Sequence, residues 1–151
     1  LMTIEMIKAM FDACYLAGRT RAMLPALPEG VTSSYIHYLD VIDSLERQGL
    51  RVRVSDIGEK LDIPRPGVTR TVKEMENRGY LRKMASEEDG RVVYITATEK
   101  GKQLSKRYNQ DYFACLAPQL ADISDEDAAS AIRTIEKMHR VMSERRGRLD
   151  G

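Results

Sequence analysis

The spacing of apolar residues along the chain predicts a mainly helical protein. Side chains three or four positions apart share one face of a helix, and this spacing recurs in the stretches 2–18, 33–47 and 124–142. The apolar stripes consist of Ile4, Ile7, Met10, Phe11 and Cys14 in the first stretch, Ile36, Leu39, Ile42 and Leu45 in the second, and Ala128, Ala131, Ile132, Ile135, Met138 and Met142 in the third. Each of these helices needs a surface on which to bury its stripe.

Capping and helix-breaking residues set the expected ends of these helices. Gly18 and the stretch 25–28, which begins and ends with proline, are expected to end the first helix. Thr98 is expected to cap a helix that ends or bends near Pro118. The last helix is expected to begin after Ser124, which is followed by acidic residues that suit the first turn of a helix.

The segment after Arg53 predicts a short helix followed by a turn. Ser55 is a suitable N-cap, because its side-chain oxygen can accept a hydrogen bond from a free backbone N–H in the first turn. Ile57 and Leu61 lie four residues apart and therefore share one face. Pro64 ends the helix, since proline lacks a backbone N–H and disfavours helix in the residue before it.

A second short helix is expected to begin near Arg65, where Pro66 is tolerated in the first turn, and to end at Gly79. This helix has an apolar side and a polar side. The polar side suits insertion into the major groove of DNA. Arginine can bond guanine through two hydrogen bonds, and threonine can contact a base edge or the methyl group of thymine. The apolar side consists of Val68, Val72 and Met75.

An antiparallel hairpin is predicted after the second helix. Its strands are expected over 80–85 and 91–97, the second of which is rich in β-branched residues, and its tip at 86–90 contains the Asp-Gly pair typical of hairpins. Residues 51–54 alternate arginine and valine and could pair with this hairpin. Helix, turn, helix and hairpin in this order indicate a winged helix-turn-helix lobe.

Several polar residues of this lobe suit DNA binding. Lys73 and Ser55 are placed for phosphate contacts, which fix the register of a protein on DNA. Arg91 can reach a minor groove, whose negative potential attracts arginine, and Asp89 is close enough in sequence to orient it. The residues expected to bind DNA are Ser55, Arg65, Pro66, Gly67, Thr69, Arg70, Lys73, Asp89 and Arg91.

Positive charge is concentrated on the same part of the chain. The net charge of all 151 residues is only +1, but residues 51–107 hold 14 basic and 9 acidic residues, a net of +5, while each flanking segment carries −2. A positive field on one lobe is the expected electrostatic signature of a nucleic-acid-binding protein. The near-neutral total and the small Gly67 leave open a winged-helix module that binds proteins and not DNA.

Residues 54–101 resemble the DNA-binding lobe of the MarR family of bacterial transcriptional regulators. In that family the second helix reads the major groove and the wing arginine enters the minor groove. Serine is common in the family where Pro64 stands, and serine or threonine where Gly67 stands, so a cap and a phosphate contact are missing here. The matching motifs are Ser55-Asp-Ile57, Arg65-Pro66, Val68-Thr-Arg70, Glu76-x-Arg-Gly79, Ser86-Glu-Glu-Asp89-x-Arg91 and Thr98-Glu-Lys-Gly101.

The MarR resemblance implies a homodimer in which the N- and C-terminal helices of two subunits interleave. It divides a single domain, residues 1–151, into dimerisation helices at 1–31 and 98–151 and a DNA-binding lobe at 32–97. The implied function is that of a sequence-specific repressor, bound to double-stranded DNA at a pseudo-palindromic operator and responsive to a small-molecule effector. The residues that could line an effector pocket, or equally pack in the core, are Tyr35, His37 and Tyr38.

A second resemblance leaves a metal-dependent repressor open. Residues 35–83 alone are similar to repressors related to diphtheria toxin repressor, which sense iron or manganese. Glu136 and His139, in the last helix, are the one pair at a ligand-like spacing. The long acidic wing and the segment 98–101 favour the MarR family, so neither a metal nor a cofactor is expected.

Other classes of protein find little support in the sequence. No grouping of nucleophile, histidine and acid and no phosphate-binding glycine loop is evident, which argues against an enzyme. No apolar run reaches the roughly 18 residues of a membrane helix. Cys14 and Cys115 lie far apart, which indicates reduced thiols and a cytoplasmic protein. Cys14 loosely resembles the peroxide-sensing cysteine of some MarR relatives, but a small buried apolar role fits it better.

Overall fold

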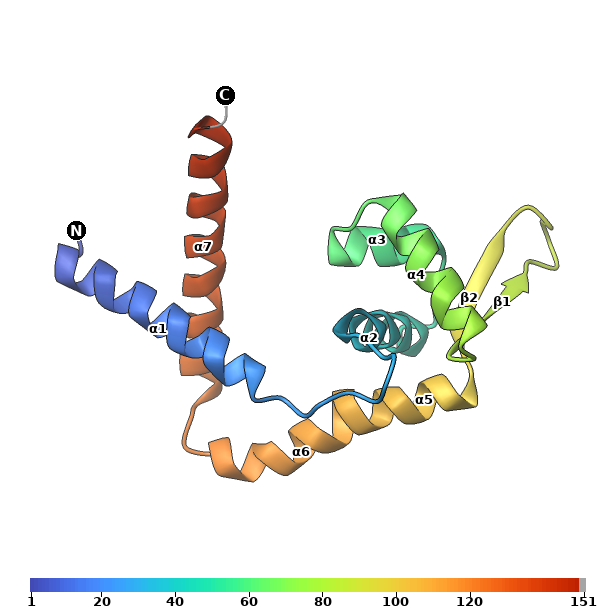
Figure 1. The fold of residues 1–151 in the computed structure, drawn as a ribbon, viewed down its shortest axis with the longest axis horizontal. Helices are drawn as coiled ribbons and strands as arrows, with labels where there is room; N and C mark the ends of the chain where they lie inside the picture. Colours follow the sequence, from blue (N-terminus) through green and yellow to red (C-terminus); the bar gives the residue numbers. More distant parts are fainter. Residues whose placement is uncertain (150–151) are drawn as a thin grey trace. The chain divides into compact units, whose positions relative to one another are not determined.

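The computed structural model describes residues 1–149 and is mostly helical, with one two-stranded antiparallel sheet. This arrangement confirms the predicted fold class (Figure 1). The chain forms two compact units, the lobe unit of residues 27–118 and the terminal-helix unit of residues 1–26 with the chain from Gln119 onward. The elements are α1 (Ile4–Ala22), α2 (Ser33–Arg47), α3 (Val54–Leu61), α4 (Arg65–Asn77), β1 (Leu81–Ala85), β2 (Val93–Ala97), α5 (Glu99–Ser105), the π-helix η1 (Lys106–Asp111), α6 (Tyr112–Leu116), the 3₁₀ helix η2 (Ala117–Leu120) and α7 (Asp125–Leu149).

The core of the lobe unit is built around α2. The predicted stripe of α2 is buried, and apolar side chains from every neighbouring element pack against it. Burial of this kind contributes about 1.5–3 kcal/mol for each large apolar side chain. One core therefore fixes α4 and the hairpin against α2. Its buried members include Ile36, Leu39, Ile42 and Leu45 of α2, Ile57 of α3, Val68, Val72 and Met75 of α4, Leu81 of β1, Ile95 of β2 and Leu104 of α5.

The predicted helix-turn-helix is formed by α3 and α4, but its first cap differs from the prediction. α3 begins at Val54, two residues earlier than a cap at Ser55 implies, so Ser55 lies inside the first turn and Arg53 occupies the N-cap position. The Asp56 carboxylate accepts a hydrogen bond from the Arg53 backbone N–H at 2.8 Å. The prediction of Ser55 as the cap is wrong, because the acid one residue further along satisfies the helix end. Asp62, in the left-handed region with φ of 52°, then ends α3.

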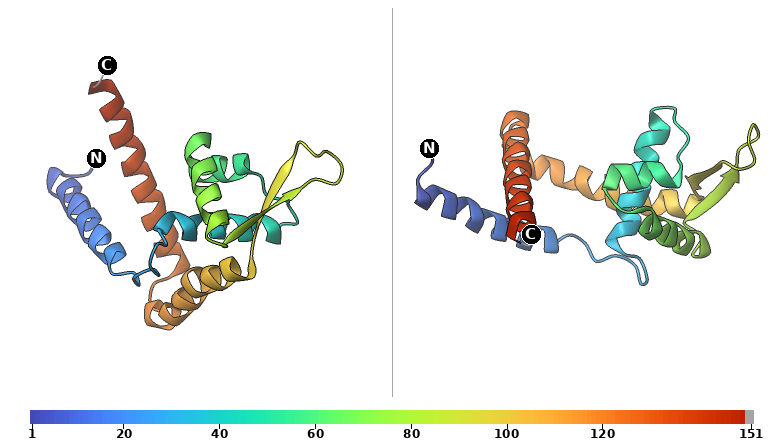
Figure 2. Two further views of the ribbon diagram at one scale, coloured as in Figure 1. Left: turned by 45° about the vertical axis from the view of Figure 1, so that its right-hand side comes forward. Right: turned by 90° about the horizontal axis from the view of Figure 1, so that it is seen from above.

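The two strands of the hairpin pair in antiparallel register, starting with Leu81 opposite Ala97 at the base. Val52 adds a bridge to Ile95, as the alternation in residues 51–54 predicts. Both views in Figure 2 show the hairpin extending beyond α3 and α4. The hairpin therefore has the form and the position of a wing.

α5 continues into a π-helical turn and α6 and is not one uniform α-helix. The Thr98 hydroxyl accepts a backbone N–H of the first turn at 3.2 Å, which confirms the predicted cap. Asn109 Nδ2 donates to the Ile36 carbonyl at 3.1 Å and to the Ser105 hydroxyl at 2.9 Å. The bond to Ile36 joins η1 to α2, and Leu104 of α5 packs in the same core, so the lobe unit extends beyond residue 97 to Pro118.

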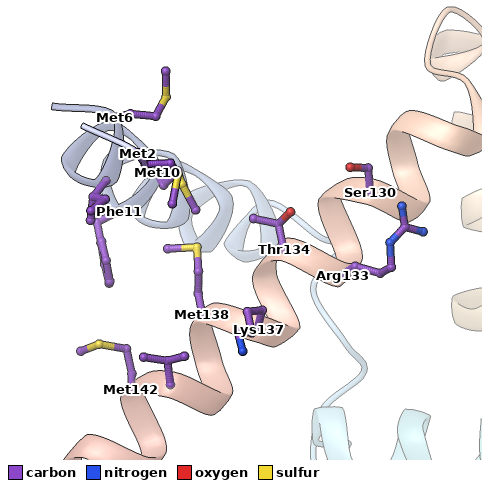
Figure 3. Close-up of a pocket in the computed structure, with 12 residues that line it drawn as sticks. Met2, Met6, Met10, Phe11, Ser130, Arg133, Thr134, Lys137, Met138 and Met142 are labelled. Carbon is purple, nitrogen blue, oxygen red and sulfur yellow. The ribbon is translucent and has the colours of Figure 1, made fainter. Parts of the chain in front are cut away.

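The two long helices of the terminal-helix unit bury few of their apolar side chains. α1 has no buried residue, and α7 exposes Ile132 and Ile135 to 57% and 52%. A groove of about 750 Å³ lies between α1 and α7, and five of its twelve lining residues are methionines (Figure 3). The prediction that Gly18 ends the first helix is wrong, because α1 passes through it to Ala22. A single glycine inside a helix costs only about 1 kcal/mol relative to alanine.

Candidate nucleic-acid interface

α4 presents two chemically different sides. Val68, Val72 and Met75 pack in the core at 1% exposure or less. Their helical spacing leaves the opposite side in solvent, as predicted, so that two guanidinium groups, an ammonium group and a hydroxyl group share one accessible surface. The exposed residues of α4 from the predicted set are Arg65, Pro66, Thr69, Arg70 and Lys73, and Gly67 is half-buried.

The N-terminal end of α4 carries an uncompensated positive dipole. Pro64 occupies the N-cap position and makes no side-chain capping bond, and the first turn contains no acid. Anions are stabilised at such a helix end. Gly67 is not needed there for steric reasons, because a Cβ added to it would lie 3.4 Å from Ile63 Cγ2, an ordinary contact.

The tip of the hairpin holds Arg91 outward. The Asp89 carboxylate accepts hydrogen bonds from the Arg91 backbone N–H at 3.0 Å and from Arg91 Nε at 3.4 Å, so the two residues are in contact, as their spacing predicts. The Ser86 hydroxyl accepts the backbone N–H groups of Glu88 and Asp89 and fixes the loop. The predicted strand start at Arg91 is wrong, because Arg91 belongs to this loop and β2 begins at Val93. The Arg91 side chain is 94% exposed.

Sequence reasoning missed one basic cluster of the lobe. The guanidinium carbons of Arg51 and Arg53 lie 5.4 and 5.6 Å from the ring centre of Tyr94. The available signal was the alternation of arginine and valine, which turns both arginines to the same side of a strand. The ring beneath them could be identified only from the pairing of Val52 with Ile95.

The C-terminal end of α4 is tied to neighbouring elements. Lys100 Nζ donates to the Arg78 carbonyl at 2.9 Å and lies 4.4 Å from the centre of the Tyr80 ring. The Arg78 guanidinium lies against Gly30, where a Cβ would approach one of its nitrogens to 1.9 Å. Tyr35 of α2 meets the Tyr80 ring edge-on at 5.8 Å. These contacts fix the orientation of α4 relative to α2 and α5.

The tyrosines that could have lined an effector pocket pack in the core. Tyr35 and Tyr38 are 0% and 2% exposed, whereas His37 faces solvent. The Tyr35 hydroxyl is buried and has no hydrogen-bond partner among the described residues. Burial raises the pKa of Tyr35 above its ordinary value of 10.0, and the nearby Glu74 carboxylate raises it further.

Residues 1–149 contain no group of three or more histidines, cysteines or acids placed to hold a metal ion. Glu136 and His139 both lie on α7. Cys14 is half-buried and Cys115 exposed, and neither forms a disulfide bond within the described residues. Within the same range no helix combines the length and apolar character needed to cross a bilayer.

The sequence of this chain is similar to those of known transcriptional regulators. Residues 29–92 match the MarR family. YdgJ of Bacillus subtilis (strain 168), an uncharacterised HTH-type transcriptional regulator, is 22% identical over 109 residues, which span 72% of this chain and 64% of that relative.

Solved structures share the fold. FabT of Streptococcus pneumoniae, crystallised in complex with DNA, superposes with a TM-score of 0.62 at 19% identity, covering 93% of this chain and 94% of FabT. A MarR/EmrR family regulator from Acinetobacter sp. ADP1 superposes with a TM-score of 0.64 at 18% identity, covering 95% of this chain and 99% of that one. At these identities the likeness concerns the fold alone.

Proposed function

We propose that this chain is a MarR-family transcriptional regulator that represses transcription as a homodimer bound to double-stranded DNA. The match of residues 29–92 to the MarR family supports this proposal. α4 enters the major groove, and Arg91 at the tip of the wing enters the adjacent minor groove. The observation that carries this proposal is the pairing of an exposed polar side on α4 with an arginine held outward by Asp89.

Different residues serve different steps of DNA recognition. Arg65, Thr69 and Arg70 contact base edges, since arginine and threonine can read the major-groove pattern of hydrogen-bond groups and methyls. Ser55 and Lys73 contact phosphates and fix the register of the lobe. The uncapped N-terminal end of α4 adds favourable electrostatics for the DNA backbone.

The homodimer forms through the terminal-helix unit. Its support is the exposed apolar surface of α1 and α7, which a second copy of the chain would cover. A twofold dimer carries two copies of α4, which reach successive major grooves if they stand about 34–36 Å apart. The preferred DNA is therefore a pseudo-palindrome.

Control by a small molecule acts on the separation of the two lobes. A ligand that binds better to a dimer with the wrong spacing shifts the population away from the DNA-binding form, and a few kcal/mol of difference is enough to release DNA. A cavity of about 240 Å³ between α2 and α5 supports binding of a small molecule, and both acidic and basic side chains line it. Its charged lining residues are Asp43, Glu46, Lys102 and Lys106.

Fluorescence anisotropy with labelled DNA tests the proposal. DNA from the region upstream of the protein's own gene and DNA selected from a random pool are compared with scrambled DNA across a salt series. We expect strong preference for one pseudo-palindromic site and affinity that falls steeply as salt rises. Equal, weak binding to selected and scrambled DNA would overturn the proposal and point to a winged-helix module that binds a protein.

A further inference from the structure

The outer face of the wing carries arginines that the recognition of a core site by α4 and Arg91 does not use. Val52 and Ile95 pair and are each 1% exposed, so they point into the lobe. Their chain neighbours Arg51, Arg53 and Tyr94 therefore lie on the opposite face, because successive side chains of a strand alternate.

The register of the hairpin adds a third arginine to this face. Arg82 of β1 pairs with Thr96 of β2, and Met84 pairs with Tyr94. Residues directly opposite each other project to the same side of a sheet. We define the outer wing face by Arg51, Arg53, Arg82, Met84, Tyr94 and Thr96.

The arginines of the outer wing face form no ion pair with the part of the chain that the structure describes. Two carboxylates near this face accept hydrogen bonds from other groups: Glu46 accepts the Thr96 hydroxyl at 2.8 Å, and Asp56 accepts the backbone N–H of Arg53 at 2.8 Å. Two guanidinium groups within 5.6 Å of one ring centre concentrate positive charge at this point, and a bound anion would offset it.

Phosphate is the anion that fits this arrangement. Guanidinium groups bind phosphate oxygens through paired hydrogen bonds, and a ring beneath them reduces the rotamer freedom that would otherwise be lost on binding. The face belongs to the same hairpin as Arg91, and Arg53 directly precedes the helix that contains Ser55. A wing whose tip lies in a minor groove therefore brings this face to the adjoining backbone.

We propose that the outer wing face is a phosphate clamp for DNA that flanks the site read by α4, so that the protein binds a longer stretch of DNA than its recognition helices span. The inference rests on the proposed DNA-binding function. It assigns Arg51, Arg53 and Arg82 to affinity and not to sequence preference, because phosphate contacts do not distinguish bases.

The test compares two DNA lengths with two variants of equal charge. DNA is first selected for binding by the wild-type protein, then prepared as a long duplex and as a duplex trimmed to the core palindrome. Arg51→Gln/Arg53→Gln removes the clamp. Arg47→Gln/Arg107→Gln is the control, because it removes the same charge from exposed positions outside the outer wing face.

The expected result concerns only the long duplex. The clamp variant should lose roughly 10-fold or more in affinity, and its slope of log affinity against log salt should fall by about 0.9 for each phosphate contact removed. The ratio of its affinity for selected DNA to its affinity for scrambled DNA should equal that of the wild type. On the trimmed duplex the clamp variant, the control and the wild type should bind alike.

Two outcomes separate failure of the clamp from failure of the proposed function. A clamp variant that matches the control on both duplexes, while the wild type still prefers selected DNA, overturns the clamp alone. A wild-type protein without preference for any selected DNA overturns the proposed function, and the clamp with it.

Tyr94 acts as a positioning residue, and its role can be separated from support of the fold. Tyr94→Phe keeps the ring and should bind the long duplex as the wild type does. Tyr94→Leu should lose affinity for the long duplex by roughly 3-fold to 10-fold while the salt slope stays unchanged, because both arginines remain. Equal weakening on both duplexes would instead indicate a structural role and count against positioning.

Discussion

Arg91 is held by its neighbour Asp89 while almost all of its side chain stays in solvent. The exposed pair itself contributes about 0–1 kcal/mol to folding. The contact matters for DNA binding, because an arginine side chain that is already oriented outward loses less conformational entropy when it enters a minor groove.

Replacement of Arg91 by alanine should therefore weaken DNA binding without unfolding the protein. We expect a loss of about 1–3 kcal/mol in binding, comparable to the removal of one good base contact, and an unchanged melting temperature. Anisotropy titrations and thermal melts measure the two quantities. Asp89→Ala, which keeps Arg91 but frees it, should lose less affinity. Wild-type affinity in Arg91→Ala would remove the wing from the mechanism.

Replacement of Tyr35 should change the stability of the protein, whereas replacement of Arg91 should change DNA binding. Its hydroxyl is buried without a partner among the described residues, and such a group costs about 1–3 kcal/mol. Tyr35→Phe keeps the ring contact with Tyr80 and removes the hydroxyl, so the free energy of unfolding in urea should stay equal or rise. A loss above about 1 kcal/mol would show that the hydroxyl has a stabilising partner such as Glu74 or a buried water.

Because the pKa of Tyr35 is raised in the folded state, the stability of the wild type should depend on pH differently from that of Tyr35→Phe. The folded state favours the neutral phenol, so this contribution to stability is complete below the unfolded pKa of 10.0. It is lost as pH rises from 10.0 through the higher folded pKa. The stability of the wild type should thus decline more steeply above pH 10 than that of Tyr35→Phe, as measured by urea unfolding at a series of alkaline pH values.

At the scale of the elements, the junction between the hairpin and α5 depends on a missing side chain. A Cβ on Gly101 would lie 2.1 Å from the Tyr80 carbonyl oxygen, which is backbone and cannot turn aside. Gly101→Ala should therefore force α5 away from the hairpin base and destabilise the lobe by about 1–3 kcal/mol, the usual range for overpacking. Urea unfolding followed by circular dichroism measures the effect.

Gly67→Ala is the matched control for this substitution. It makes the same change inside a helix of the same lobe, but its Cβ would meet only an ordinary contact. The control should keep or gain stability, by up to about 1 kcal/mol, because alanine favours helix over glycine. Equal losses in both variants would contradict the steric argument and indicate that glycine is required at neither position for its size.

The sequence predicted those elements whose cause is local. The stripe of α4, the cap at Thr98 and the hairpin follow from spacing and residue type, and all three are present. The errors arose where two local signals competed. Asp56 completed the α3 cap in place of Ser55, and the rest of α1 outweighed the helix-breaking tendency of Gly18. Nothing in the spacing of residues 99–118 predicted the π-helical turn.

The candidate site divides in the same way. Exposure of the polar side of α4 follows from helical periodicity, and the Asp89–Arg91 contact follows from a separation of two residues. The cluster around Tyr94 depends on contacts between residues about 40 positions apart, which spacing alone cannot supply. Local chemistry was predictable, and its assembly into surfaces was not.

At the scale of the whole molecule, the terminal-helix unit is the part least satisfied by a single chain. Ile132 and Ile135 are more than half exposed, and Ile132 does not line the groove against α1. Each large apolar side chain left in water forgoes about 1.5–3 kcal/mol of burial. A second copy of the chain that covers this side of α7 would recover that energy and would also set the distance between two lobes.

The double variant Ile132→Glu/Ile135→Glu should therefore sediment as a monomer at concentrations where the wild type is a dimer. A monomer binds a palindromic site through one lobe and loses the added affinity of two linked lobes. Its affinity for that site should therefore fall by roughly 100-fold or more, and its slope of log affinity against log salt should halve. Arg140→Glu introduces the same side chain at an exposed position outside the predicted stripe of α7 and should remain dimeric. A double variant that stays dimeric would place the pairing surface elsewhere. A monomer that keeps full affinity would show that one lobe suffices for the site.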